Sequence, residues 1–156
     1  DIVIVETSDA VLVADRMQSH EIGVLAKQLQ KQGRTEASLH RRAFRPWGSY
    51  TVLEKSPGYQ VKRLSLKPGS VLSLQRHQHR AEHWVVVKGQ ASIVHGEDEV
   101  VLNENESTYI PAGMIHQLAN HADEVLEVIE VHTGSYLEED DIERLDDPYQ
   151  RRGTSG

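Results

Sequence analysis

Histidines are concentrated at one point of the chain: of the nine present, His77, His79 and His83 lie within seven residues of one another. Alternate side chains of an extended strand share a face, so Ser73, Gln75, His77 and His79 are expected to point the same way. Burying imidazole and amide groups without partners is costly. This face is therefore expected to bind a metal or a polar ligand.

A carboxylate and a fourth histidine complete the candidate site. Glu82 closely follows the cluster, and the turn Pro111-Ala-Gly113 leads into a strand whose first inward residue is expected to be His116. Imidazole and carboxylate are preferred ligands of zinc, and cobalt, manganese and iron suit them as well. His83 has the opposite parity to Glu82 and is expected to lie outside. The other histidines of this region and its flanks are expected to be ordinary surface or core residues: His40, His95, His121 and His132.

Short β-type runs separated by Gly and Pro turns fill the region from Tyr50 to His132. This spacing is typical of an antiparallel sandwich or small barrel, so the fold class is predicted to be mainly β. Before it, residues 1–6 and 10–14 predict a hairpin and Asp15 an N-cap with a helix following, while residues 34–44 predict a linker. After it, residues 138–150 predict a short helix on the barrel. The predicted strands are 50–54, 59–67, 71–77, 83–88, 90–95, 99–102, 108–110, 115–119 and 124–132.

Composition restricts the function classes. The chain has 156 residues, 38% of them hydrophobic, and no cysteine. No apolar stretch approaches the roughly 18 residues of a membrane span. The net charge of −7 lies largely in residues 138–147, where seven acids face one arginine, and this acidic run is interpreted as a solvated face. Nucleic acid and anionic membranes are therefore not expected partners, and a cytoplasmic piece of a longer protein is expected.

Two motifs resemble those of the cupin superfamily, small jelly-roll barrels (double-stranded β-helices) that hold one metal among three histidines and a glutamate. Gly69, Glu82 and Gly89 stand at the separations of the first motif, and Gln75 and His77 occupy its histidine places. The second motif matches at Pro111, Gly113, His116 and Asn120. The resemblance implies that Gln75, His77, Glu82 and His116 bind the metal. His79 is the alternative to Gln75, because zinc prefers imidazole to an amide oxygen.

A denser resemblance covers residues 45–152. The strings Arg45-Pro-Trp-Gly-Ser-Tyr50, Leu74-Gln-Arg-His77-Gln-His79 and Ile110-Pro-Ala-Gly-Met-Ile-His116 are similar to those of the C-terminal domain of bifunctional mannose-1-phosphate guanylyltransferase/mannose-6-phosphate isomerases. This implies that residues 1–33 are the tail of a guanylyltransferase domain and that 153–156 are a disordered tail. The family usually shows Gln where His132 stands and Gly where Gln150 stands.

The resemblance implies interconversion of mannose 6-phosphate and fructose 6-phosphate through an enediol, supplying mannose for GDP-mannose and polysaccharide synthesis. Base candidates are His79, Lys62 and Glu130. Arginine suits phosphate, and the candidates are Arg80, Arg45, Arg63, Arg144 and Arg151. A homodimer is also implied. Two alternatives stay open: a non-catalytic cupin that binds a sugar or sugar nucleotide and regulates the transferase, and an iron-dependent cupin oxygenase.

Overall fold

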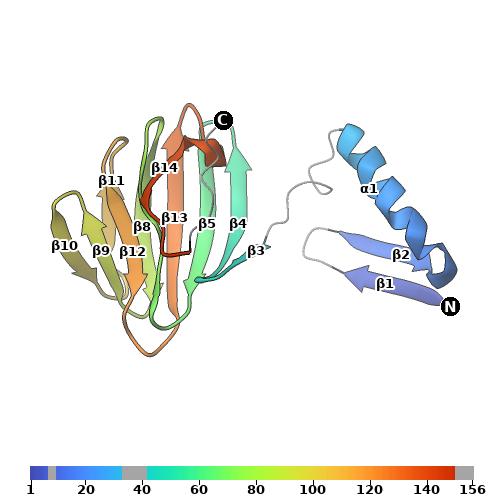
Figure 1. Ribbon diagram of the computed structural model, residues 1–156, viewed down its shortest axis with the longest axis horizontal. Helices are drawn as coiled ribbons and strands as arrows, with labels where there is room; N and C mark the ends of the chain where they lie inside the picture. The colour runs from blue at the N-terminus through green and yellow to red at the C-terminus, as the bar shows by residue number, and fades with distance from the viewer. Residues whose placement is uncertain (7–9, 33–41, 150–156) are drawn as a thin grey trace. The chain divides into compact units, whose positions relative to one another are not determined.

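A computed structural model describes residues 1–6, 10–32 and 42–149. The chain divides into two compact units, residues 1–41 and 42–156 (Figure 1). Within the described residues, no helix is long and apolar enough to cross a membrane. The predicted linker residues 34–41 and the C-terminal residues 150–156, with Arg151, lie outside the described part.

The first unit is the predicted hairpin with a helix. Its elements are β1 (Ile2–Glu6), β2 (Val11–Asp15), the 3₁₀ helix η1 (Arg16–Glu21) and α1 (Ile22–Lys31). Asp15 caps η1 as predicted, its Oδ1 accepting a hydrogen bond from the Met17 N–H at 2.9 Å. Ile4 and Val13 lie opposite each other in the hairpin and are 68% and 62% exposed. One face of the hairpin is therefore apolar and exposed.

The second unit is built from two six-stranded antiparallel sheets (Figure 1). One has the order β10-β9-β12-β7-β14 with β6 on β12, and the other β11-β8-β13-β5-β4-β3. The strands are β3 (Arg42–Arg45), β4 (Gly48–Ser56), β5 (Tyr59–Leu66), β6 (Ser70–Val71), β7 (Leu74–His77), β8 (Arg80–Lys88), β9 (Ala91–His95), β10 (Asp98–Leu102), β11 (Ser107–Ile110), β12 (His116–Asn120), β13 (Leu126–Gly134) and β14 (Ile142–Asp146). The predicted strands are present, except that 71–77 is divided into β6 and β7 by residues 72 and 73. The mainly β fold class is confirmed.

Side chains that alternate along the strands fill the interior of the barrel. Along β5 and β13 the inward-facing side chains change from apolar to polar. Val128 of β13 faces inward opposite Leu64 of β5, in an apolar half. Two residues further along, Glu130 lies opposite Lys62, and all four of these side chains are buried. Side chains of equal parity share a face, so one strand face supplies both an apolar core and a polar interior. The apolar half comprises Trp47, Leu64, Leu66, Trp84, Val86, Ala91, Ile93, Leu102, Ile110, Leu118, Leu126 and Val128.

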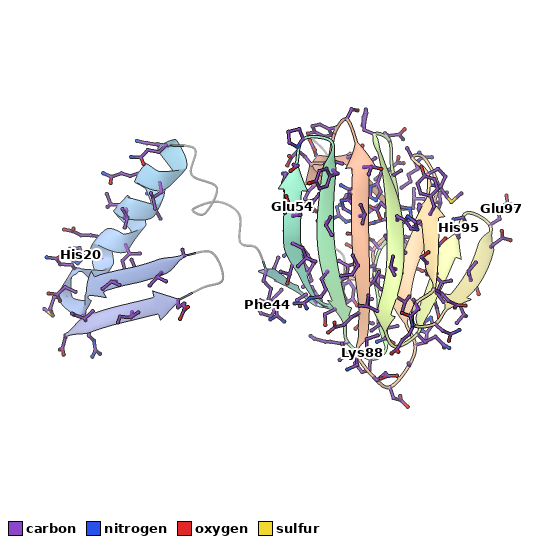
Figure 2. The ribbon with its side chains drawn as sticks, turned by 180° about the vertical axis from the view of Figure 1, so that it is seen from behind. His20, Phe44, Glu54, Lys88, His95 and Glu97 are labelled. Atoms are coloured by element: carbon purple, nitrogen blue, oxygen red, sulfur yellow. The ribbon has the colours of Figure 1, made fainter. Side chains whose placement is uncertain are left out.

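Two predicted elements differ from the structure. Residues 42–44, expected to end the linker, belong with Arg45 to β3, which pairs with β4, and Phe44 projects into solvent (Figure 2). Residues 138–150 were expected to be a helix, but residues 139–146 form the 3₁₀ turn η3 (Glu139–Asp141) and then β14, which pairs with β7. The reason is that β7 would otherwise be an open edge, and an edge strand presents unpaired N–H and C=O groups that a further strand satisfies.

Candidate metal centre and adjoining cavity

Three buried side chains from three strands converge inside the barrel. His77 ends β7, Glu82 lies in β8, and His116 begins β12. Each is at most 2% exposed, and their ligating atoms lie within 4.8 Å of one another. His77 Nε2 is 2.9 Å from Glu82 Oε1, and His116 Nε2 is 3.8 Å from Glu82 Oε2. Two imidazoles and a carboxylate so placed can hold a divalent metal.

His116 shows the orientation that a metal ligand needs. Its Nδ1 lies 2.9 Å from the Met114 carbonyl oxygen, which assigns the ring proton to Nδ1. Nε2 then carries a lone pair, and it is buried without a hydrogen-bond partner. Burial, the largest effect, lowers the pKa of His116 in spite of the opposing charge of Glu82, which favours the unprotonated ring that a metal ligand requires. A backbone carbonyl that fixes the tautomer is the usual support of a ligating histidine, and the residues fit a metal.

Glu82 is held as a carboxylate. Trp84 Nε1 donates to its Oε2 at 2.9 Å, and Arg80 Nε donates to its Oε1 at 3.2 Å. Burial raises the pKa of this carboxyl, but the hydrogen bond from His77 and the electrostatic interactions with His132, His77 and His116 outweigh burial. Its pKa therefore stays well below the usual value. Glu82 offers a charged oxygen to any cation in the centre.

Gln75 lies next to the three converging residues, whereas His79 does not. Gln75 pairs in register with His116, its Oε1 accepts a hydrogen bond from Ser73 Oγ at 2.9 Å, and its Nε2 is 3.5 Å from His77 Nε2. The side chain of His79 is 58% exposed. The expectation that His79 faces the cavity is wrong, because β7 ends at His77 and strand alternation does not extend past that residue.

The acidic run contains a buried anchor. The side chain of Asp141 is 1% exposed, its Oδ1 lies 2.8 Å from His79 Nδ1, and it also accepts the backbone N–H groups of Gln78 and His79. Burial raises its pKa, but these hydrogen bonds lower the pKa overall. The interpretation of residues 138–147 as a solvated face is therefore wrong at Asp141. This residue ties the start of β14 to the turn between β7 and β8.

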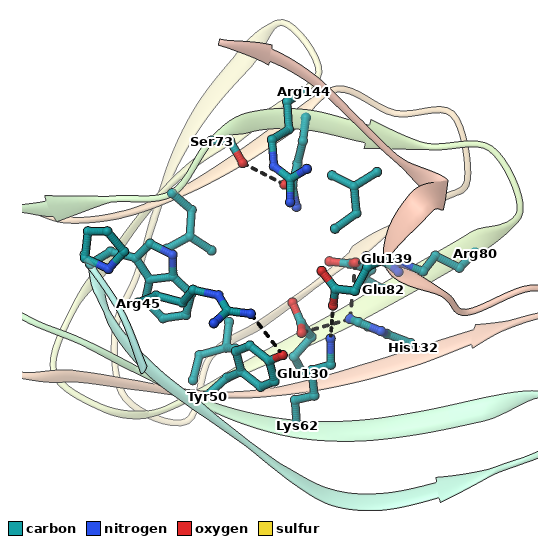
Figure 3. Close-up of a pocket in the computed structure, with 16 residues that line it drawn as sticks. Arg45, Tyr50, Lys62, Ser73, Arg80, Glu82, Glu130, His132, Glu139 and Arg144 are labelled. Atoms are coloured by element: carbon teal, nitrogen blue, oxygen red, sulfur yellow. Dashed lines mark hydrogen bonds and ion pairs between the residues drawn. The ribbon is translucent and has the colours of Figure 1, made fainter. Parts of the chain in front are cut away.

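A cavity of about 460 Å³ opens beside the centre (Figure 3). Lys62 and Glu130 line it, so the predicted inward parity of both is right. Lys62 Nζ donates to Glu139 Oε1 at 3.4 Å and lies 5.0 Å from the centre of the Tyr50 ring. Burial raises the pKa of Glu139, but the charges of Lys62 and Arg80 hold it below its usual value. The cavity is thus lined by paired charges, which suits a polar, anionic ligand.

The predicted phosphate-binding arginines separate into three groups. Arg45 and Arg144 line the cavity, Arg45 Nη2 donating to Tyr50 Oη at 3.4 Å (Figure 3). Arg80 also lines it, but it is 2% exposed and bound to Glu82. Arg63 is exposed and does not line the cavity, so the expectation for Arg63 is wrong. In β5 it has the opposite parity to Lys62, which faces inward.

Sequence reasoning missed His132. It was expected to be an ordinary histidine, yet it is 1% exposed, and its Nε2 lies 2.8 Å from Glu130 Oε2 and 3.2 Å from Glu82 Oε1. Glu82, Glu130 and His132 form a second group whose ligating atoms lie within 4.8 Å of one another. The missed signal was parity, because residues 130 and 132 share a strand face.

By contrast, His83 lies outside as predicted, with its ring 6.3 Å from that of Tyr109, and His95 lies near the surface (Figure 2).

Comparison with known proteins gives one family and several relatives. The family model "Mannose-6-phosphate isomerase C-terminal" matches residues 32–147. Xanthan biosynthesis protein XanB of Xanthomonas campestris pv. campestris is 50% identical over 97% of this chain and 32% of that protein. Alginate biosynthesis protein AlgA of Pseudomonas aeruginosa and mannose-1-phosphate guanylyltransferase of Escherichia coli K12 are each 49% identical over 97% of this chain, covering 31% and 32% of those proteins. The chain spans about a third of the length of these relatives.

Solved structures match more than half of the chain. Oxalate decarboxylase from Bacillus subtilis matches with a TM-score of 0.60 at 20% identity, over 70% of this chain and 30% of that one. A Klebsiella pneumoniae protein with a double-stranded β-helix domain matches at 0.53 and 18% identity, over 65% and 84%. The Schizosaccharomyces pombe Cnp3 cupin domain matches at 0.54 and 13% identity, over 55% and 60%. These likenesses confirm the predicted cupin fold.

Proposed function

The chain belongs to the mannose-6-phosphate isomerase C-terminal family, and on that premise we propose that its barrel is a metal-dependent isomerase of mannose 6-phosphate and fructose 6-phosphate. The observation that carries the proposal is the buried group of His77, Glu82 and His116 beside a cavity lined by cationic side chains. In the whole protein this reaction would supply mannose for GDP-mannose and polysaccharide synthesis.

The metal would be held by His77, Glu82 and His116. Gln75 would be the fourth ligand if its amide turned so that Oε1, which accepts from Ser73, took the place of Nε2 beside His77. Zinc suits this donor set best, and cobalt, manganese and iron are compatible. At such a site a divalent cation polarises a carbonyl oxygen and stabilises negative charge that develops on it. His79 is not proposed as the ligand or the base, because its side chain is 58% exposed and bound to Asp141.

Aldose–ketose interconversion moves a proton between neighbouring carbons, and two ionisable side chains of the cavity, Glu130 and Lys62, are candidates for a role in it. Glu130 is 6% exposed, and its Oε2 lies 2.8 Å from His132 Nε2. Lys62 is 7% exposed and bound to Glu139. A positioned base is worth about 10²–10⁴ in rate. We assign proton abstraction to Glu130, because a carboxyl group is a proton acceptor of the kind that general-base catalysis uses, and assign to Lys62 the orientation of the sugar hydroxyls.

The substrate phosphate is assigned to Arg45 and Arg144. Both line the cavity. Arg80 lines it as well, but it is 2% exposed, and its guanidinium donates to Glu82 and to the Glu138 carbonyl oxygen. Guanidinium groups bind phosphate through paired, charge-assisted hydrogen bonds. Arg45 is braced by the Tyr50 ring, 5.3 Å from the guanidinium carbon, which reduces the entropy lost when it binds an anion.

Matched arginine variants test this assignment. Arg45→Gln should raise KM for mannose 6-phosphate about 10- to 100-fold, the equivalent of losing one or two charge-assisted hydrogen bonds. Arg63→Gln removes the same charge outside the cavity and should leave KM unchanged. Equal effects of the two variants would refute the assignment. A folded, metal-loaded chain with no isomerase activity would instead favour the sugar-binding, regulatory cupin.

We further propose that the chain is the C-terminal third of a bifunctional cytoplasmic enzyme that forms homodimers, and that the hairpin and helix of residues 1–32 pack on the preceding guanylyltransferase portion. The support is the exposed apolar hairpin face, whose members Ile2, Ile4, Val11 and Val13 are 62–72% exposed. Hydrogen exchange tests this packing. The β1 and β2 amides should exchange more slowly in the full-length protein than in this chain, and equal rates would contradict the proposal.

A further inference from the structure

The side chain of Tyr50 lies between two cationic side chains of the cavity. Its ring centre is 5.3 Å from the Arg45 guanidinium carbon and 5.0 Å from Lys62 Nζ, and Figure 3 shows Tyr50 between these two residues. We propose that the Tyr50 hydroxyl donates a hydrogen bond to the phosphate group of the ligand, beside Arg45. This inference rests on the function proposed above, because it takes a sugar phosphate to be the ligand of the cavity.

The strand β4 brings Tyr50 to the cavity. Tyr50 lies opposite Leu64 of β5, and both residues line the cavity. The Tyr50 ring is partly buried and packs against the apolar half of the barrel. A tyrosine placed in this way is anchored by its apolar ring, while its hydroxyl needs a polar partner. The ring therefore gives the hydroxyl a fixed position at the wall of the cavity.

The hydroxyl has a hydrogen to give to a ligand. Tyr50 Oη accepts a hydrogen bond from Arg45 Nη2 at 3.4 Å, and a hydroxyl that accepts one hydrogen bond can donate another. Within residues 1–6, 10–32 and 42–149, no side chain accepts the hydrogen of this hydroxyl. The carboxylates of the cavity are bound to other groups, since Glu139 pairs with Lys62 and Glu130 with His132. An acceptor on the ligand would complete the hydrogen bonding of Tyr50.

Arg45 and Tyr50 are placed to bind one anion together. Arg45 Nη1 donates to the Phe44 carbonyl oxygen at 3.0 Å, and Nη2 donates to Tyr50. Each of these nitrogens carries a second hydrogen, so the guanidinium is held in place and still has hydrogens for an anion. Because Nη2 and Oη are 3.4 Å apart, one phosphate group can accept from both at ordinary hydrogen-bond lengths of about 2.5–3.0 Å.

Tyr50→Phe tests the hydroxyl alone, because it keeps the ring that contacts Arg45 and Lys62. The probe is mannitol 6-phosphate, which has no carbonyl group and cannot be isomerised, titrated calorimetrically into the zinc-loaded whole chain. Its Kd should be about 10-fold higher for Tyr50→Phe than for the unaltered chain, as expected for the loss of one hydrogen bond to a charged group. Tyr109→Phe removes the hydroxyl of an exposed tyrosine that does not line the cavity and should leave the Kd unchanged.

A second ligand distinguishes the phosphate from the sugar. Inorganic phosphate, titrated into the metal-free whole chain and followed by ³¹P nuclear magnetic resonance, should also bind about 10-fold more weakly to Tyr50→Phe. The melting temperature should be the same in the unaltered chain, Tyr50→Phe and Tyr109→Phe, which separates a lost ligand contact from a lost structural one.

Three results would overturn the inference. Equal affinities of the unaltered chain and Tyr50→Phe for mannitol 6-phosphate would refute the role of Tyr50 and leave the proposed function standing. Weaker binding of mannitol 6-phosphate with unchanged binding of inorganic phosphate would place the hydroxyl on the sugar instead. An unaltered chain that binds neither ligand would overturn both this inference and the proposed function.

Discussion

Asp141→Asn is the substitution whose effect follows most directly from the contacts in the structure. The Asp141 carboxylate accepts hydrogen bonds from the backbone N–H groups of Gln78 and His79 at 3.1 and 3.3 Å and from His79 Nδ1 at 2.8 Å. An asparagine has one acceptor oxygen in place of two and no charge. At least one N–H of this turn would therefore lose its partner.

The expected cost is worked from those bonds. Hydrogen bonds to a charged group contribute about 1.5–3 kcal/mol each and neutral ones about 1, so Asp141→Asn should lower the free energy of unfolding by about 2–3 kcal/mol. Urea denaturation measures this change. With a slope of about 2 kcal/mol per molar, the midpoint should fall by about 1–1.5 M while the slope stays constant.

The stability lost in Asp141→Asn should depend on pH in a way that identifies the carboxylate as its cause. Because the folded state lowers the pKa of Asp141, the carboxylate stabilises the protein above the ordinary aspartate pKa of about 3.9, and this contribution is lost as the pH falls through the lower folded value. The difference between the unaltered chain and Asp141→Asn should be constant near neutral pH and shrink below about pH 4. A midpoint change under about 0.3 M, or a difference that grows in acid, would refute this account of Asp141.

Three further substitutions probe the barrel. Trp84→Phe removes the indole N–H that binds Glu82 at 2.9 Å and should lower the unfolding free energy by about 2–4 kcal/mol in urea denaturation. Gly48→Ala should abolish soluble expression or reduce the melting temperature sharply, because a Cβ there would collide with the Ser65 carbonyl oxygen at a φ of +150°; an unchanged melting temperature would contradict the packing. Arg76→Gln breaks only an exposed ion pair and should leave the urea midpoint unchanged.

Strand alternation explains how much of the site could be predicted from sequence. The predicted inward parity of Lys62 and Glu130 is right, because β5 and β13 alternate regularly along their facing segments. The same rule misplaced His79, since it follows the last residue of β7. It was not applied to His132, which shares the face of Glu130 and lies beside Glu82.

The C-terminal elements show what sequence reasoning could not reach. The acidic residues around Ile142 give no local sign of a strand. The strand β14 forms because it pairs with β7, more than sixty residues earlier in the chain. Asp141 is buried for a similar reason: its partners are the backbone N–H groups of residues 78 and 79, and residue type does not reveal backbone partners. Both the pairing of β14 with β7 and the hydrogen bonds of Asp141 join segments far apart in the sequence, so local sequence patterns do not predict them.

Metal dependence of isomerisation is the most direct test of the proposed function. The chain would be stripped with a chelator, supplied with fructose 6-phosphate, and assayed for mannose 6-phosphate before and after addition of zinc, cobalt or manganese. Activity that disappears on chelation and returns with metal in the unaltered chain, but does not return in His116→Asn, is the predicted result. Full activity in chelated protein whose metal content has been shown to be negligible would contradict the account.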